Sequence, residues 1–273
     1  MNPGPGILLP SEHRSDKDPS TGSTIHQLTN ATCINHTPFF LTKAFTPNEQ
    51  HVLFTSYRTG TPQLYEVELI DGPIRQLTDI DGLHPFSAVI ASNGKEVFYT
   101  RSEAGSEPAG VIEAVSRYDL SRRTNHRLPR AQLAECSLSA DGKSVVTAVK
   151  RDGKHGLLVA ATSGTSGEVV LEFSRTVIHP QFHPKDVDWI EFAADPAPRM
   201  YRVRRDGADL ECLLENDNEN FIVHETFLGQ SHDVVFVEWP RALRHLSWES
   251  GEIKTIAEAV SYTHLPLPTS DLV

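Results

Sequence analysis

Two histidines occupy matching places in successive stretches of the chain. His179 is followed by Pro-Gln-Phe and His224 by Glu-Thr-Phe, and the two are 45 residues apart. Neutral imidazole is a common ligand of divalent metals, and its near-neutral pKa suits proton transfer. The pair is therefore a candidate for catalysis or metal binding. The alternative is that each ring is a structural histidine satisfied by nearby backbone. A metal site needs three or more ligands, and the pattern joins none to His224.

The spacing of these histidines matches a repeat that organises the chain. Five segments start with an aromatic or apolar residue, pass through a turn and continue into a β-rich run. Their anchor positions are 47, 92, 140, 184 and 229, which are separated by 45, 48, 44 and 45 residues. Asn93-Gly94 and Asp141-Gly142 are tight-turn pairs, and runs such as Val97-Phe98-Tyr99 favour strands. Short strands at this period are typical of four-stranded propeller blades. A β-sandwich is the alternative, but it does not explain five similar units.

The repeat predicts an all-β chain, a β-propeller with about five blades present. Blades are expected near 37–79, 84–129, 133–174, 178–215 and 222–257, inside a partial propeller over 24–258. Residues 1–23 are expected to be disordered. Thr24–Leu28 looks like the closing strand of a blade and predicts a distant strand partner. Residues 259–273 follow no blade pattern and are interpreted as a tail that is not native, an ordinary disordered terminus being the alternative.

Charge and composition exclude several classes of function. The 273 residues carry 25 Lys and Arg against 36 Asp and Glu, a net charge of −11. This balance argues against a nucleic-acid binder and against a polybasic membrane-surface protein. No apolar stretch is long enough to span a membrane, and three well-separated cysteines argue against a disulfide framework. We expect a cytoplasmic protein.

Several motifs together resemble those of the oligogalacturonate lyases, over roughly residues 24–257. They are Thr24-Ile-His-Gln-Leu-Thr29, Phe54-Thr-Ser-Tyr-Arg-Thr-Gly-Thr-Pro-Gln-Leu-Tyr65, His179-Pro-Gln-Phe182, Arg199-Met-Tyr-Arg-Val-Arg-Arg-Asp-Gly207 and Val223-His-Glu-Thr-Phe227. The resemblance implies a seven-bladed propeller, of which about two C-terminal blades would be absent here. It also implies an Mn²⁺-dependent carbon–oxygen lyase. Such an enzyme cleaves short, often unsaturated galacturonides by β-elimination during pectin degradation.

The resemblance assigns roles to individual residues. His179 matches the general base that removes the C5 proton, and His224 matches the first histidine ligand of the Mn²⁺. The other ligands of the family lie in a Gln-x-x-His-x-His segment that would fall in the absent blades, so this chain alone is expected to be inactive or feeble. For the arginine that neutralises the substrate carboxylate, Arg175, Arg199 and Arg151 are the candidates. Their alternative is an exposed position at a blade edge.

The expected partner is an acidic oligosaccharide, with no nucleic acid and no membrane. An acidic protein that binds a polyanion needs local positive charge, and Arg199, Arg202, Arg204 and Arg205 form such a run, unless they are only a solvated strand edge. The competing function is that of a non-enzymatic TolB-like propeller which binds a protein or peptide. His179 and His224 favour the lyase, because a binding propeller has no need of them.

Overall fold

The computed structural model describes residues 4–216 and 221–258, and the tail over 259–273 lies outside them. The described residues contain 23 strands and no helix, so the all-β prediction is confirmed. In this part of the chain no helix is long and apolar enough to cross a membrane.

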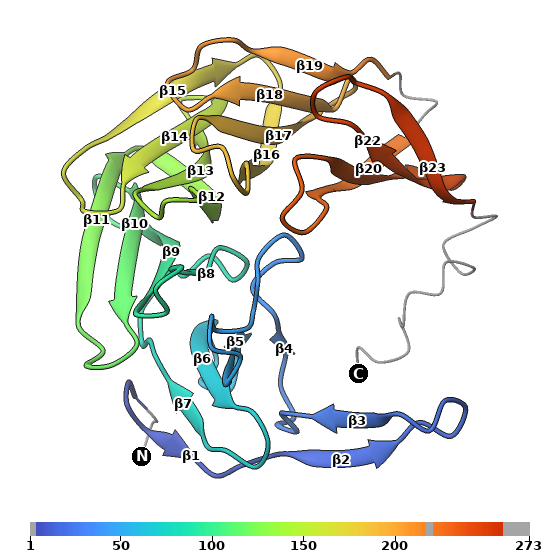
Figure 1. Ribbon diagram of the computed structural model, residues 1–273. Coiled ribbons are helices and arrows are strands. Elements are labelled where there is room, and N and C mark those ends of the chain that lie inside the picture. The colour runs from blue at the N-terminus through green and yellow to red at the C-terminus, as the bar shows by residue number, and fades with distance from the viewer. Residues whose placement is uncertain (1–3, 217–220, 259–273) are drawn as a thin grey trace.

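In the described residues, five antiparallel sheets of four or five strands follow one another in chain order around an arc (Figure 1). The first has the order β1-β7-β6-β5-β4 and the second β11-β10-β9-β8. The third, fourth and fifth run β12 to β15, β16 to β19 and β20 to β23. This arrangement is that of a β-propeller, while the total number of blades in the ring stays a prediction.

The strand bounds are as follows. The first two sheets contain β1 (Leu8–Leu9), β4 (Asn35–His36), β5 (His51–Ser56), β6 (Gln63–Glu68), β7 (Ile74–Gln76), β8 (Val89–Ile90), β9 (Glu96–Glu103), β10 (Ala109–Ser116) and β11 (Arg122–Pro129). The third sheet contains β12 (Ala131–Leu138), β13 (Ser144–Arg151), β14 (Lys154–Ala161) and β15 (Gly167–Phe173). The last two contain β16 (Thr176–Phe182), β17 (Trp189–Asp195), β18 (Met200–Arg204), β19 (Glu211–Leu214), β20 (Phe221–Phe227), β21 (Val234–Trp239), β22 (Ala242–Leu246) and β23 (Ile253–Glu258).

The hydrophobic core lies between neighbouring sheets. Strand β13 shows the principle, because successive side chains of a strand point to opposite faces. Val145 packs into the cluster shared with the second sheet, whereas Val146 packs into the cluster shared with the fourth. Middle strands are thus buried on both faces, which explains why they read as continuous apolar runs rather than as an alternation.

The N-terminal segment contains strands where disorder was expected. β1 pairs with β7 at the edge of the first sheet, and β2 (Arg14–Lys17) pairs with β3 (Thr24–Gln27) in a separate exposed hairpin. The distant partner expected for Thr24–Leu28 is therefore not found among the described strands. The local turn explains this result: Asp18 and Ser23 are joined by a backbone hydrogen bond, and Gly22 supplies a φ of 72°.

Candidate active site

A β-bulge places each of the two histidines at the inner side of the arc. In β16, pairing with β17 shifts between Ile178 and Gln181, and in β20, pairing with β21 shifts between Val223 and Thr226. Both strands are the first of their sheets and lie towards the centre in Figure 1. The bulge lets an inward side chain leave the regular alternation of the strand.

The histidines adopt the same unusual backbone conformation. His179 has a φ of 56° and His224 a φ of 57°. This left-handed conformation costs a residue with a Cβ about 1–2 kcal/mol. Strain of this kind persists where the surroundings enforce it, and it is concentrated at functional sites. The shared conformation makes the two positions structurally equivalent, as the spacing of 45 residues predicted.

In each of the five sheets, the edge that begins with β4, β8, β12, β16 or β20 is interrupted at a similar level. In β12 the pairing shifts between Leu133 and Cys136. In the second sheet, residues 84–88 lie between the paired positions 83 and 89, and in the first sheet 37–44 lie between 36 and 45. The interruption is thus longest in the first sheet, where it forms a loop that carries Phe39 and Phe40.

The loop over 37–44 brings two aromatic rings against the histidines. The ring centroid of Phe39 is 5.1 Å from that of His179. Phe40 lies edge-on to both imidazoles, at 5.8 Å from His179 and 5.2 Å from His224. Phe40 itself is 50 % exposed. The sequence repeat did not reveal this contact, although two adjacent aromatics in a loop were a signal that could have drawn attention to it.

Glu225 joins His179 to Arg199. The Nδ1 atom of His179 lies 3.3 Å from Oε1 of Glu225, whose side chain is fully buried. Arg199 donates from Nε to Oε2 of Glu225 at 3.2 Å and from Nη2 to Oε1 at 3.1 Å, and its Nη1 donates to Asp195 at 2.7 Å. Arg199 is therefore held between two carboxylates of the protein.

A second buried carboxyl group lies beside Glu225. Gln181 donates from Nε2 to Glu191 at 2.9 Å and to the backbone carbonyl of Glu225 at 3.1 Å. Burial raises the pKa of Glu191 well above 4.5, and the charge of Glu225 raises it further. Burial alone would also raise the pKa of Glu225, but the hydrogen bond from His179 and the charge of Arg199 outweigh burial and lower it. Glu225 is thus the ionised member of the pair.

His224 is suited to act as a neutral ligand, because burial lowers its pKa. However, no group of three or more His, Cys, Asp or Glu side chains in the described residues is arranged to hold a metal ion. The residues described here thus offer one of the predicted Mn²⁺ ligands and do not form a manganese site by themselves.

Arg175 and Arg151 do not join the cluster of His179 and Glu225. Arg175 donates to the backbone carbonyls of Pro196 and Pro198 and to the hydroxyl of Tyr201. Arg151, at the end of β13, lies 3.8 Å from Asp152. Of the three candidate arginines, the structure brings only Arg199 to the histidine.

The arginine run after Arg199 is balanced by nearby acids. Arg202 pairs with Glu211, Arg204 with Asp209 and Arg205 with Asp188. Arg202 and Arg204 also lie over the ring of Trp189. The arrangement matches the solvated-edge alternative better than a free patch of positive charge.

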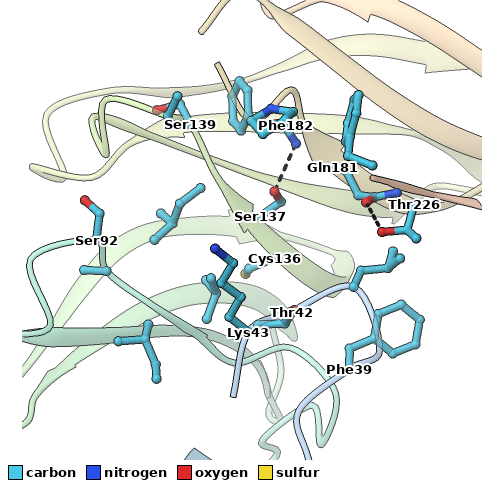
Figure 2. A pocket seen from close by; sticks show the side chains of 18 of the residues that line it. Phe39, Thr42, Lys43, Ser92, Cys136, Ser137, Ser139, Gln181, Phe182 and Thr226 are labelled. Carbon is cyan, nitrogen blue, oxygen red and sulfur yellow. Dashed lines mark hydrogen bonds between the residues drawn. The ribbon is translucent and has the colours of Figure 1, made fainter. Parts of the chain in front are cut away.

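A cavity of about 740 Å³ adjoins the histidine bulges (Figure 2). Pro180, Gln181 and Thr226, which follow the two histidines in β16 and β20, line one side. The other lining residues that carry polar groups include Thr42, Lys43, Ser92, Ser137, Ser139 and Gln230. Figure 2 shows Lys43 extending into this space, together with the hydrogen bonds from Phe182 to Ser137 and from Thr226 to Gln181. Polar side chains thus lie among apolar ones in its lining.

Comparison with known proteins supports this architecture. No family model matches the chain. The chain is 19 % identical, over 261 residues, to an oligogalacturonide lyase of Pectobacterium atrosepticum, and the match covers 86 % of the chain and 66 % of that protein. It therefore spans just under two thirds of the length of this curated relative.

The comparison with solved structures also finds oligogalacturonate lyases. An oligogalacturonate lyase in complex with manganese matches with a TM-score of 0.83 at 17 % identity, covering 94 % of this chain and 75 % of that one. The oligogalacturonate lyase of Vibrio parahaemolyticus matches with a TM-score of 0.80 at 18 % identity, covering 93 % and 74 %. TolB of Acinetobacter baumannii follows with a TM-score of 0.62 at 16 % identity, covering 91 % and 62 %. These matches establish the β-propeller fold and confirm the resemblance to oligogalacturonate lyases.

Proposed function

We propose that this chain carries the base-bearing part of a lyase that cleaves short galacturonides by β-elimination, in the manner of the oligogalacturonate lyases it resembles. The observation that carries the proposal is the cluster of His179, Glu225 and Arg199 at an inner bulge. It supplies an imidazole with a buried carboxylate on one ring nitrogen. A protein- or peptide-binding propeller of the TolB type has no need of this strained arrangement.

The proposed reaction needs one base and no water. His179 takes the C5 proton of a uronate, which is weakly acidic because a carboxylate group is attached to C5. The electron pair of the C5–H bond forms the double bond between C4 and C5. The bond from C4 to the glycosidic oxygen breaks, and the leaving oxygen keeps the electron pair of this C4–O bond. It takes up one proton, which balances the proton that His179 removes. Hydrolysis by two catalytic carboxylates is less favoured, because Glu225 is bound by Arg199 and His179.

Mn²⁺ is the cofactor that the resemblance implies, with His224 as one proposed ligand. A divalent cation on the substrate carboxylate would stabilise the charge that develops there. Because the described residues supply no cluster of three ligands, the steps above are assigned to side chains alone. A seven-bladed ring, pectin-derived substrate and cytoplasmic location belong to the same proposal.

The experiment is an elimination assay on unsaturated digalacturonate with added Mn²⁺, followed by the ultraviolet absorbance of the conjugated product. It compares this chain with the longer gene product that the resemblance implies, here called the full-length product. We expect weak or no turnover from the chain alone and clear turnover from the full-length product. A full-length product without a Gln-x-x-His-x-His segment and without turnover would overturn the proposal.

A further inference from the structure

We propose that Glu225, which accepts two hydrogen bonds from Arg199, is a positioning residue. It fixes the proton of His179 on Nδ1 and leaves Nε2 as the basic atom. The proposal deepens the function proposed above and rests on it for the reaction. The tautomer itself is a property of the folded chain, and it can be tested without any substrate.

The chemistry of the acceptor decides which nitrogen carries the proton. Both oxygens of Glu225 accept hydrogen bonds from the guanidinium group of Arg199, and a carboxylate paired in this way can only accept. Oε1 of Glu225 lies 3.3 Å from Nδ1 of His179, so this nitrogen has to be the donor. A neutral imidazole carries one N–H, and its other nitrogen is then the acceptor. Nε2 is therefore left with a free electron pair, which is what a general base requires.

Arg199 keeps the carboxylate from rotating away. Its two hydrogen bonds engage both oxygens of Glu225, in the parallel arrangement that the flat guanidinium group favours. The third nitrogen is held by Asp195, and Arg199 is only 6 % exposed. A guanidinium with these partners has little freedom to bind the carboxylate of a substrate. We therefore assign Arg199 to positioning, rather than to the substrate-neutralising role that the sequence resemblance offered.

The backbone beside the carboxylate is fixed as well. Gln181 donates to the carbonyl of Glu225 and accepts from the hydroxyl of Thr226 at 3.2 Å. Its side chain thus joins the bulged strand β20 to strand β16, which carries His179. The bulge fixes the direction in which the Glu225 side chain leaves the strand, and Gln181 fixes the bulge.

The test observes the ring nitrogens of His179 by NMR in protein labelled with ¹⁵N-histidine. Comparison with the spectrum of His179→Asn identifies its signals among the 13 histidines. In the unmodified chain we expect a pyrrole-type shift for Nδ1 and a pyridine-type shift for Nε2. In Glu225→Gln we expect these shifts to move towards the average of the two tautomers.

Glu191→Gln is the matched control. It makes the same change from acid to amide in the same buried cluster, but Glu191 is bonded to Gln181 and not to His179. It should leave the His179 signals unchanged. A thermal melt of each variant confirms that it is folded. The proposal is overturned if His179 carries its proton on Nε2 in the unmodified chain, or if folded Glu225→Gln keeps the Nδ1–H tautomer.

Kinetic measurements distinguish a failure of the positioning role from a failure of the proposed function. In a catalytically active full-length product, Glu225→Gln should lower kcat by about tenfold or more with little change in KM, because it alters the base and not substrate binding. If no elimination is found but the NMR result stands, the proposed function fails and the positioning role survives as a structural fact. If elimination occurs but the tautomer does not respond to Glu225, the positioning role alone fails.

Discussion

His179 and His224 have the same left-handed backbone conformation, with φ values of 56° and 57°, at the same bulge of two successive sheets. Each lies against the ring of Phe40. Two residues of a repeat that share an unfavourable conformation indicate that the geometry is enforced by the fold. The same geometry brings both imidazoles to one place.

Stability should reveal this strain. His179→Gly and His179→Ala both remove the ring, but only glycine adopts a positive φ without cost. Glycine also has greater conformational freedom in the unfolded chain, which offsets part of this gain. The free energy of unfolding of His179→Gly should therefore exceed that of His179→Ala by about 0.5–1 kcal/mol. Urea unfolding measures the difference. Thr176→Gly and Thr176→Ala, on the same strand, serve as controls, and there the alanine variant should be the more stable. If glycine is the more stable, or alanine the more stable, at both positions, the result argues against strain at His179.

The buried carboxyl of Glu191 should make stability depend on pH. Its pKa in the folded protein is raised above 4.5, so its stabilising contribution is complete below that value and is lost as the pH rises through the raised pKa. Glu191→Gln stays neutral, and its stability relative to the unmodified chain should therefore improve as the pH rises above 4.5. Urea unfolding at several pH values tests this. The exposed Glu168→Gln serves as control, and a parallel response of both variants would count against a protonated Glu191.

Among the described residues that line the cavity, Lys43 is the one lysine or arginine. If the cavity takes an acidic sugar, Lys43→Met should weaken the binding of digalacturonate by about 2- to 5-fold, as expected for a partly solvated charge pair. Calorimetry at low salt provides the measurement. Lys154→Met, which removes a lysine paired with Glu172 on β15, should leave binding unchanged. Equal binding by the Lys43 variant, or equal affinity for a neutral disaccharide, would remove Lys43 from the binding site.

Manganese should have little effect on the chain as it stands. The described residues contain no cluster of three metal-binding side chains, and a ligand stabilises a fold only as far as it binds. A thermal melt with and without Mn²⁺ should therefore give nearly the same Tm. A rise of several degrees that disappears in His224→Ala would show that the metal site is more complete than the described residues indicate.

The all-β fold could be predicted from the sequence, because the turns and apolar runs that indicate strands are local. The spacing of the repeat also placed His179 and His224 together. The hydrogen bonds that join His179, Glu225 and Arg199 were harder to predict, because they depend on contacts between sheets. Glu225 was visible only as the acid next to His224, and nothing local indicated that it would bond to His179 in the preceding sheet.

The arginines show the same limit. Arg175 and Arg199 were equal candidates on sequence grounds, and only the fold distinguishes them. Arg175 is bound by two backbone carbonyls near its own sheet edge, whereas Arg199 crosses to Glu225. The disorder expected over residues 1–23 failed to anticipate β1 and β2, because the first needs an edge strand, β7, supplied by residues much later in the chain.

The proposed function depends on His179 as the base of a β-elimination. The most direct measurement is the rate of unsaturated uronate formation by the full-length gene product with Mn²⁺, before and after His179→Asn. We expect this rate to fall by about 10²- to 10⁴-fold, with digalacturonate binding retained. Undiminished elimination by the folded variant would contradict it.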